Sequence, residues 1–162
     1  MKQYWLFKAE PDVYGIEHLA AEKKQTGRWD GIRNYQARNF LRDQVALDDE
    51  VLLYHSHCKQ IGIVGTARVV KTAYADPTQF NPESDYYDPK ASPDLPRWFS
   101  VDICLQEKFS RVILLSEIKQ QPQLIDMVLL RQGRLSIQPV TPKEWKTVLG
   151  MQLLFAFSLR NS

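Results

Sequence analysis

The chain has 162 residues, a common size for one domain, and it is long enough to bury a core without disulfide or metal staples. Hydrophobic residues make up 44% and charged residues 25%, and the formal net charge of +2 does not by itself indicate a nucleic-acid-binding protein. With two cysteines, no signal-peptide pattern and no run long enough to span a membrane, the composition excludes disulfide scaffolds, membrane proteins and disordered chains, and we expect a soluble, cytoplasmic protein.

The first part of the chain carries a strand signal and then a helix signal. The aromatic-apolar run 4–7 predicts a strand, and Pro11 ends it because proline lacks an amide donor. Apolar residues at helical spacing predict a short helix over 15–24. Residues 26–28 are predicted to break that helix.

A second helix and two strands follow. Asn34 is predicted to cap a helix with an apolar inner face. Residues 51–56 and 61–74 predict two strands, and the connection between them has hairpin length. Gly62 and Gly65 indicate close packing or a bulge in the second strand.

Residues 75–97 differ from the rest of the chain because they hold five prolines and few aliphatic residues. We expect a long loop here, and loops of this length inside a compact domain are usually functional or disordered. Trp98 follows the loop directly, where its ring either belongs to the core or lines a cleft.

The remaining segments predict a mixture of strands and helices. Clear alternation predicts a strand over 98–105, a second strand is expected over 112–115, and helical spacing marks 123–130. Residues 135–140 predict a short strand. The sequence thus indicates an α+β domain with about five strands and a half-open barrel.

The C-terminal helix has a recognisable start. Thr141 and Glu144 fit a capping box, and Pro142 stands at the first helical position. The apolar stretch 153–157 is expected to be a docked strand or tail.

Positive charge is concentrated in one segment. Residues 27–42 mix arginines and aromatic rings with a single acidic residue: Arg28, Arg33, Arg38 and Arg42, Trp29 and Tyr35, and Asp30. This mixture suits nucleic acid, because bases stack on rings while arginines hold phosphates. The alternative is a solvated helix face with Trp29 in the core.

The small net charge conceals an uneven distribution, with basic and acidic residues concentrated in different segments of the chain. Residues 131–149 carry four basic residues and one acidic one, whereas residues 72–89 carry four acidic residues and no Lys or Arg. Such a chain can present one basic face. The alternative is that the basic and acidic regions pair with each other.

Two histidines two residues apart, His55 and His57, would share a strand face and could reach one metal ion. No third ligand stands at a recognisable spacing, so we expect no metal site and no cofactor. Ser56 between them would point to the opposite face. Lys8 and Glu10 form either an acid-base pair or a surface ion pair.

Seven segments, in order, carry a resemblance to a known family: 5–11, 29–39, 53–56, 62–65, 86–89, 96–99 and 134–140. The chain resembles the EVE domain family, which is related to PUA and YTH domains. The resemblance covers about residues 3–150, so we expect a single domain over 1–150 and a C-terminal tail over 151–162.

This resemblance implies a fold and a function. The fold is a PUA-like pseudobarrel, in which a curved, mostly antiparallel sheet of about five to six strands has short helices at its rim. The function is binding of nucleic acid, with DNA favoured and RNA possible, through a methylated cytosine or adenine flipped into an aromatic pocket. No membrane partner is expected.

The resemblance also implies the site residues. Trp29 would form one wall, and the second wall would come from Trp98 or from a tyrosine of the pair at 86–87. The full base pocket would comprise Lys8, Ala9, Glu10, Trp29, Asn34, Tyr35, Tyr54, His55, Ser56 and Trp98. Phosphates would be held by Arg28, Arg33 and Arg38.

Two other functions compete with this one. The first is a PUA-type module that binds structured or modified RNA. The second is an enzyme that uses the same pocket, with Lys8, Glu10, Tyr54 and His55 as its candidate groups. The sequence contains neither a complete metal ligand set nor a nucleophile-base pair, which disfavours the enzyme.

Overall fold

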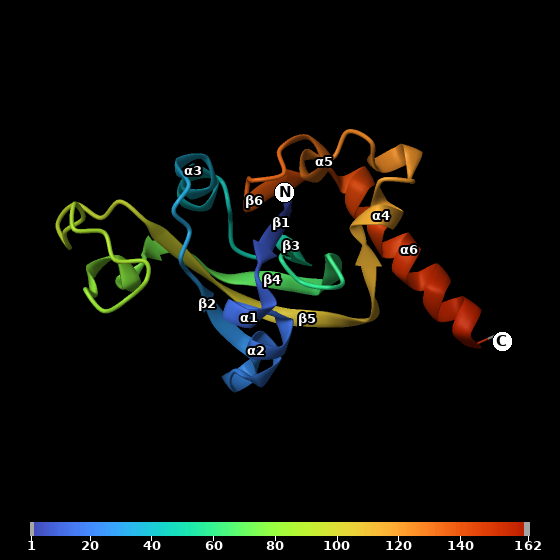
Figure 1. Cartoon of the computed structure of the whole chain (residues 1–162), viewed down its shortest axis with the longest axis horizontal. Helices are drawn as coiled ribbons and strands as arrows, with labels where there is room; N and C mark the ends of the chain where they lie inside the picture. Colours follow the sequence, from blue (N-terminus) through green and yellow to red (C-terminus); the bar gives the residue numbers. More distant parts are fainter. Residues whose placement is uncertain (1, 161–162) are drawn as a thin grey trace.

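The structure is a computed structural model that describes the backbone of residues 2–160 and the side chains of residues 2–154. Its centre is one open, curved sheet of six strands in the order β2-β5-β4-β3-β1-β6 (Figure 1). The strands are β1 (Tyr4–Ala9), β2 (Thr26–Trp29), β3 (Glu50–His55), β4 (Gly62–Ala75), β5 (Phe99–Leu114) and β6 (Ile137–Val140). All neighbours pair antiparallel except β1 and β3, which are parallel. The expected α+β class and mostly antiparallel, unclosed sheet are confirmed.

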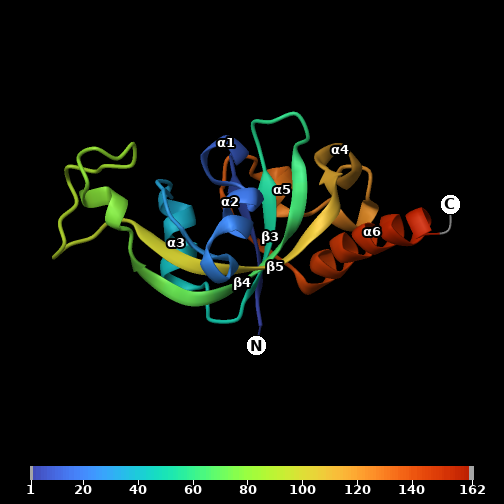
Figure 2. The same ribbon diagram turned by 90° about the horizontal axis from the view of Figure 1, so that it is seen from below.

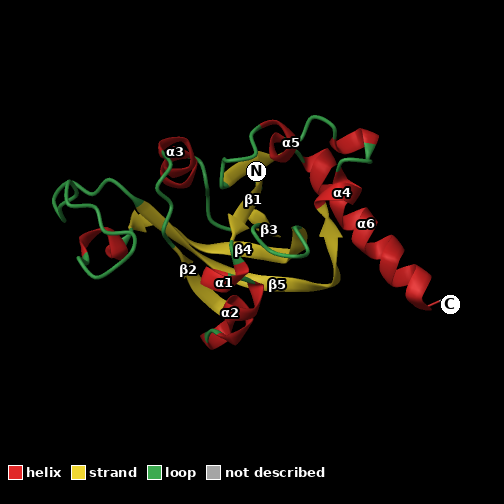
Figure 3. Ribbon diagram, viewed as in Figure 1, coloured by secondary structure: helices red, strands yellow, loops and turns green. Residues whose placement is uncertain are grey.

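Short helices surround this sheet (Figures 2 and 3). They are α1 (Pro11–Tyr14), α2 (Ile16–Ala21), α3 (Tyr35–Asp43), α4 (Leu115–Ile118), α5 (Val128–Arg131) and the longer α6 (Pro142–Arg160). Three 3-10 turns complete the set: η1 (Lys23–Gln25), η2 (Pro77–Phe80) and η3 (Pro122–Leu124). None of the helices in the described part of the chain has the length and apolar character needed to cross a membrane.

The central strands are buried on both faces. Along β1, Trp5 and Phe7 enter one core, which α2 and α3 cover, while Leu6 enters a second core against α4, α5 and α6. The same alternation separates Leu53 from Leu52 in β3. Because both faces are packed, the end of β1 is held firmly in place, and the candidate site lies there.

Two predicted helix starts are confirmed. The Asn34 side chain accepts a hydrogen bond from the Ala37 amide at 2.9 Å and caps α3. At the start of α6 the Thr141 amide donates to the Glu144 carboxylate at 2.9 Å, and the Glu144 amide donates to the Thr141 hydroxyl at 3.1 Å. Both motifs act within four residues, so the sequence alone specifies them.

Residues 26–28 lie outside any helix, as predicted, but they form β2 and pair with β5, which the sequence did not predict. Gly27 hides the strand signal, and it leaves room for Tyr14, because a Cβ at position 27 would lie 2.1 Å from the Tyr14 hydroxyl and would displace that side chain. The helix predicted over 15–24 is also too long: α2 ends at Ala21 and the distinct turn η1 follows.

Other boundaries differ in the C-terminal half. The strands predicted over 98–105 and 112–115 form one continuous strand, β5, whose register against β4 shifts at several points and so interrupts the alternation. The helix predicted over 123–130 is instead η3 followed by α5. Residues 153–157 are helical and belong to α6, rather than to the expected strand or tail.

Candidate nucleic-acid interface

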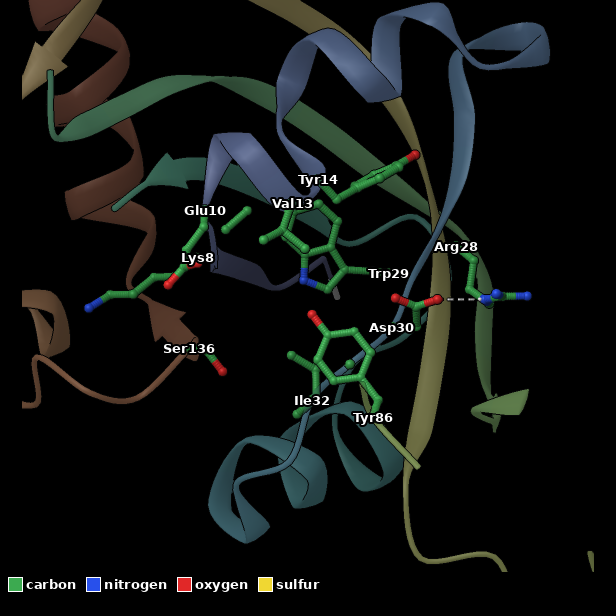
Figure 4. A pocket seen from close by; sticks show the side chains of 12 residues that line it. Lys8, Glu10, Val13, Tyr14, Arg28, Trp29, Asp30, Ile32, Tyr86 and Ser136 are labelled. Atoms are coloured by element: carbon green, nitrogen blue, oxygen red, sulfur yellow. Dashed lines mark hydrogen bonds and ion pairs between the residues drawn. The ribbon is translucent and has the colours of Figure 1, made fainter. Parts of the chain in front are cut away.

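A cavity of about 190 Å³ opens at the C-terminal end of β1 (Figure 4). It is smaller than the ~300–1,000 Å³ of a typical drug-sized site. Four parts of the fold line it: the β1 end with α1, β2 with the turn after it, the Pro-rich loop, and the segment before β6. The lining residues are Lys8, Ala9, Glu10, Val13, Tyr14, Arg28, Trp29, Asp30, Gly31, Ile32, Tyr86 and Ser136.

Trp29 forms the wall that the sheet supplies. It ends β2, pairs with Val101 of β5, and is only 6% exposed. Its ring packs against Phe7, with 5.7 Å between ring centroids, and edge-on against Tyr14 at 6.0 Å. The indole Nε1 donates no hydrogen bond to any residue that the structure describes. This wall is therefore rigid and carries an unused donor.

Tyr86 forms the opposite wall and comes from the Pro-rich loop. Its hydroxyl is directed toward the Trp29 indole (Figure 4). The ring lies directly on the backbone of Gly31, where an added Cβ would be 2.7 Å from ring atoms. Gly31 also has a φ of +77°, a conformation that glycine adopts without steric cost. A glycine at position 31 therefore allows the wall to stand where it does.

Arg33 and Asp76 hold the Tyr86 wall in place. The Arg33 guanidinium donates to the Tyr86 carbonyl at 2.7 and 3.1 Å and to the Asp76 carboxylate at 3.0 Å. The fully buried Asp76 also accepts from the Gly31 amide at 2.9 Å and from the Thr78 amide and hydroxyl. Burial alone would raise the pKa of Asp76, but these hydrogen bonds outweigh it, and the pKa lies below its usual range.

The β1 end supplies the polar floor. The Lys8 amide donates to the Ser136 carbonyl at 2.9 Å, which fixes the strand end against the segment before β6. The Lys8 amine donates to the Gly133 carbonyl, lies 5.3 Å from the centre of the Tyr54 ring, and has a pKa lowered by burial. The floor therefore offers a fixed backbone beside a partly buried cation.

Charged and phenolic groups complete the cavity. Arg28 and Asp30 form an ion pair at 2.9 Å. The Tyr14 hydroxyl donates to the Glu22 carboxylate at 3.1 Å, and burial together with this bond raises the pKa of Tyr14. Tyr14 is thus a neutral aromatic surface at physiological pH.

Five of the residues that the sequence assigns to the site line this cavity: Lys8, Ala9, Glu10, Arg28 and Trp29. Asn34, Tyr35 and Trp98 do not. Asn34 caps α3, and Tyr35 packs on Trp98 with 4.9 Å between ring centroids. Trp98 is 5% exposed and donates to the Asp88 carboxylate at 2.7 Å, so it anchors the base of the Pro-rich loop.

The Tyr54, His55 and Ser56 side chains also lie outside the cavity. Tyr54 is buried in the second core, and the His55 Nε2 accepts from the Ile16 amide at 3.1 Å. Ser56 lines a neighbouring hollow. His57 has a φ of 54° beyond the end of β3, so the two histidines no longer share a strand face. The described residues contain no cluster of three or more His, Cys, Asp or Glu that could hold a metal ion.

The arginines expected to hold phosphates are mostly engaged with the protein. Arg33 is committed to the Tyr86 loop, and its ion pair with Asp76 fits the alternative that the basic and acidic segments pair. Arg38 donates to the Asn39 side chain at 2.8 and 3.1 Å and to the Arg97 carbonyl at 3.1 Å.

The sequence did not single out six of the lining residues for the site: Val13, Tyr14, Asp30, Gly31, Ile32 and Ser136. Asp30, Ile32 and Ser136 lie inside the segments that carry the family resemblance, and this signal could have identified them. Val13 and Tyr14 reach the cavity because α1 turns sharply back after β1, and nothing in their local sequence indicates this.

Comparison with known proteins gives consistent matches along the chain. The EVE domain profile matches residues 3–151. Mouse Thymocyte nuclear protein 1 is 43% identical over 94% of this chain and 74% of its own length. Its name, which describes a nuclear protein and is shared by the rat and human relatives, contradicts the cytoplasmic location expected for this chain.

Solved structures show the same fold. The structure of a hypothetical protein from Leishmania major has a TM-score of 0.92 and 40% identity, and the match covers 96% of this chain and 98% of that one. Human THYN1 in complex with 5-methylcytosine-containing DNA has a TM-score of 0.88 and 42% identity, with coverage of 93% and 98%.

Proposed function

Because this chain belongs to the EVE domain family, we propose that it binds DNA that carries a modified base, and that the base enters the cavity between Trp29 and Tyr86. The observation that carries the proposal is a small cavity with two aromatic walls, a free indole donor and a polar floor. The human relative bound to 5-methylcytosine-containing DNA supports both the partner and the kind of base.

The free-energy cost of flipping a base and the gain from binding it are of similar size. Flipping a base out of its stack costs a few kcal/mol. Stacking on an aromatic ring returns ~1–3 kcal/mol per base, and phosphate contacts add a term that depends on salt. The two aromatic side chains that line the cavity, Trp29 and Tyr86, can therefore offset the cost of extrusion.

Recognition must use more than the methyl group. Enclosing one methyl group contributes ~0.8 kcal/mol, which gives only modest discrimination between cytosine and 5-methylcytosine. Thymine carries the same methyl group and differs in its Watson–Crick edge. A site that selects 5-methylcytosine must therefore read that edge, and the Trp29 Nε1 donor, which bonds no residue that the structure describes, is a group at the cavity that can contribute to this reading.

A binding titration with matched oligonucleotides tests the proposal. Each strand would carry cytosine, 5-methylcytosine, thymine, adenine or N6-methyladenine at one position, as DNA and as RNA, single and double stranded. We expect the tightest binding to one modified DNA strand and loss of that preference in Trp29→Ala. Equal, salt-sensitive binding to every strand would overturn the proposal, and a preference for RNA strands would favour the RNA-binding alternative.

A second variant separates the site from general stability. Trp145 in α6 is also 6% exposed but lies in the second core, away from the cavity. Trp145→Ala should destabilise the protein like Trp29→Ala while the folded fraction keeps its preference for the modified strand. Equal loss of preference in both variants would show that the Trp29 effect is only a folding defect.

A further inference from the structure

A second hollow adjoins the base cavity and shares its floor. Its volume is about 540 Å³, and four residues line both spaces: Lys8, Ala9, Glu10 and Ser136. The rest of its lining comes from two loops, one after β3 and one before β6: Ser56, His57, Gly133 and Arg134. A nucleotide whose base occupied the cavity would have its sugar and phosphate near such an adjoining space.

The charges in this hollow favour an anion. Lys8 and Arg134 contribute two cations, and Glu10 is the one acidic residue in its lining. The Glu10 carboxylate lies 3.2 Å from His57 Nδ1, so it already has a partner within the hollow. An incoming phosphate would therefore face an excess of positive charge.

Arg134 differs from the arginines near the first cavity. It is exposed, and it makes no ion pair or side-chain hydrogen bond with any described residue. Arg28 and Arg33, by contrast, pair with Asp30 and Asp76, and Arg38 bonds to its neighbours. A guanidinium that bonds no described residue is available to a ligand, and its fork of donors fits a phosphate.

The loop that carries Arg134 has room for a ligand. An added Cβ on Gly133 would meet no atom within 4 Å, so open space lies beside it. The Gly133 carbonyl accepts from the Lys8 amine, which holds the loop beside that cation. The Gly133 and Arg134 amides donate no backbone hydrogen bond within the described residues, and two free amides add donors for an anionic oxygen.

We propose that this second hollow holds a phosphodiester next to the bound base, with Arg134 as its principal contact and Lys8 beside it. The inference rests on the proposed function and adds to it the part of the surface that follows the DNA backbone. It replaces the expectation that Arg33 and Arg38 supply the phosphate contacts.

Three variants test this placement. Arg134→Gln removes the charge, Gly133→Glu adds an opposing charge in open space, and Gly133→Gln is the neutral control of the same size. Binding of single-stranded 5-methylcytosine DNA would be measured across salt concentrations. We expect Arg134→Gln to weaken binding ~10-fold at low salt and to reduce the slope of log K against log salt by ~0.7, the value for one contact. Gly133→Glu should weaken binding more than Gly133→Gln does, because the two side chains have the same size and only the first adds a negative charge.

Neutralising one phosphate identifies the group that is bound. A methylphosphonate linkage beside the modified base should weaken wild-type binding ~10-fold, yet it should cost Arg134→Gln little more, because the same contact is already lost. Wild-type affinity and salt slope in both Arg134→Gln and Gly133→Glu would overturn the inference.

The two proposals fail in different ways. If the wild type prefers the modified strand and Arg134→Gln changes nothing, only the phosphate placement is wrong. If the wild type binds all strands equally, the modified-base function is wrong, while a reduced salt slope in Arg134→Gln would still support the phosphate site. If the wild type binds no DNA, both are wrong.

Discussion

The two aromatic walls of the cavity are built in opposite ways. Trp29 sits on a strand, is almost fully buried, and is held by apolar contacts with Phe7 and Tyr14. Tyr86 sits in a long Pro-rich loop and is held by hydrogen bonds and charge through Arg33 and Asp76. Hydrophobic packing fixes one wall and a polar network fixes the other.

Because the two walls are held differently, removing them should affect stability and binding to different extents. Removing the Trp29 ring should damage the core and the proposed site together, because the ring belongs to the first core and also lines the cavity. Removing the Tyr86 ring should damage mainly the site, because the loop contributes little to either core. The four experiments below test that distinction, ordered by the expected change in the free energy of unfolding.

The largest effect is expected for Trp29→Ala. Truncation of a buried aromatic side chain costs ~3–5 kcal/mol, because it loses burial and leaves a cavity. Urea denaturation should show this loss as a lower midpoint. A change below ~1 kcal/mol would mean that the Trp29 ring is not an integral part of the first core.

Asp76→Asn should rank second. The substitution keeps the shape of the side chain but removes the charge that accepts from Arg33, and hydrogen bonds to charged groups contribute ~1.5–3 kcal/mol each. We expect the free energy of unfolding to fall by ~2 kcal/mol and binding of the modified strand to weaken, because the Tyr86 wall loses its support. Unchanged binding would show that the hydrogen bonds of Asp76 are not needed to hold Tyr86 in position. Asp94→Asn is the matched control, because Asp94 lies in the same loop and forms no ion pair with any residue that the structure describes.

Low pH should remove part of the stabilisation that the ionised Asp76 carboxylate gives to the folded protein. The pKa of Asp76 is lowered in the folded protein, so its ionised form stabilises the fold above the unfolded-state pKa of ~3.9. That stabilisation is lost as pH falls below ~4 through the lower folded-state pKa. Denaturation at a series of pH values should therefore show wild type and Asp76→Asn converging as pH falls from 5 toward 2. A constant difference would contradict the lowered pKa.

The smallest effect on stability is expected for Tyr86→Ala, below ~1 kcal/mol, since Tyr86 is only partly buried and belongs to neither core. Binding of the modified strand should nevertheless weaken by ~1–3 kcal/mol, the contribution of one stacked ring. Calorimetric titration would measure it. Tyr87→Ala is the control, because Tyr87 is 41% exposed and does not line the cavity. Equal weakening of binding in both variants would show that Tyr86 has no specific part in binding the base.

The sequence correctly predicted the features that depend on interactions between neighbouring residues. The cap of α3 by Asn34 and the capping box of α6 depend on residues within one turn, and both were found. The strand β2 was missed because it has four residues, one of them Gly27, and its identity comes from pairing with β5. Short strands of this kind are fixed by tertiary contacts rather than by their own residues.

The candidate site was predictable only in part for the same reason. Trp29 and the β1 end could be assigned from the family resemblance, whereas the second wall could not be chosen between Trp98 and the 86–87 pair. The path of the loop decides that choice, and it depends on an Arg33–Asp76 contact between residues 43 positions apart. The free Arg134 likewise becomes visible only when β6 pairs with β1 and brings its loop to the floor.

The polar attachment of the Pro-rich loop has a kinetic consequence. Breaking the contacts of Arg33 and Asp76 would release the Tyr86 wall while the six-stranded sheet stays intact, so the site can open by a local fluctuation much smaller than global unfolding. Backbone amides around Tyr86 should then exchange with deuterated water far faster than those of β1. Under the proposed function, the apparent affinity for a base would be the intrinsic affinity scaled by the fraction of molecules in which the loop is closed.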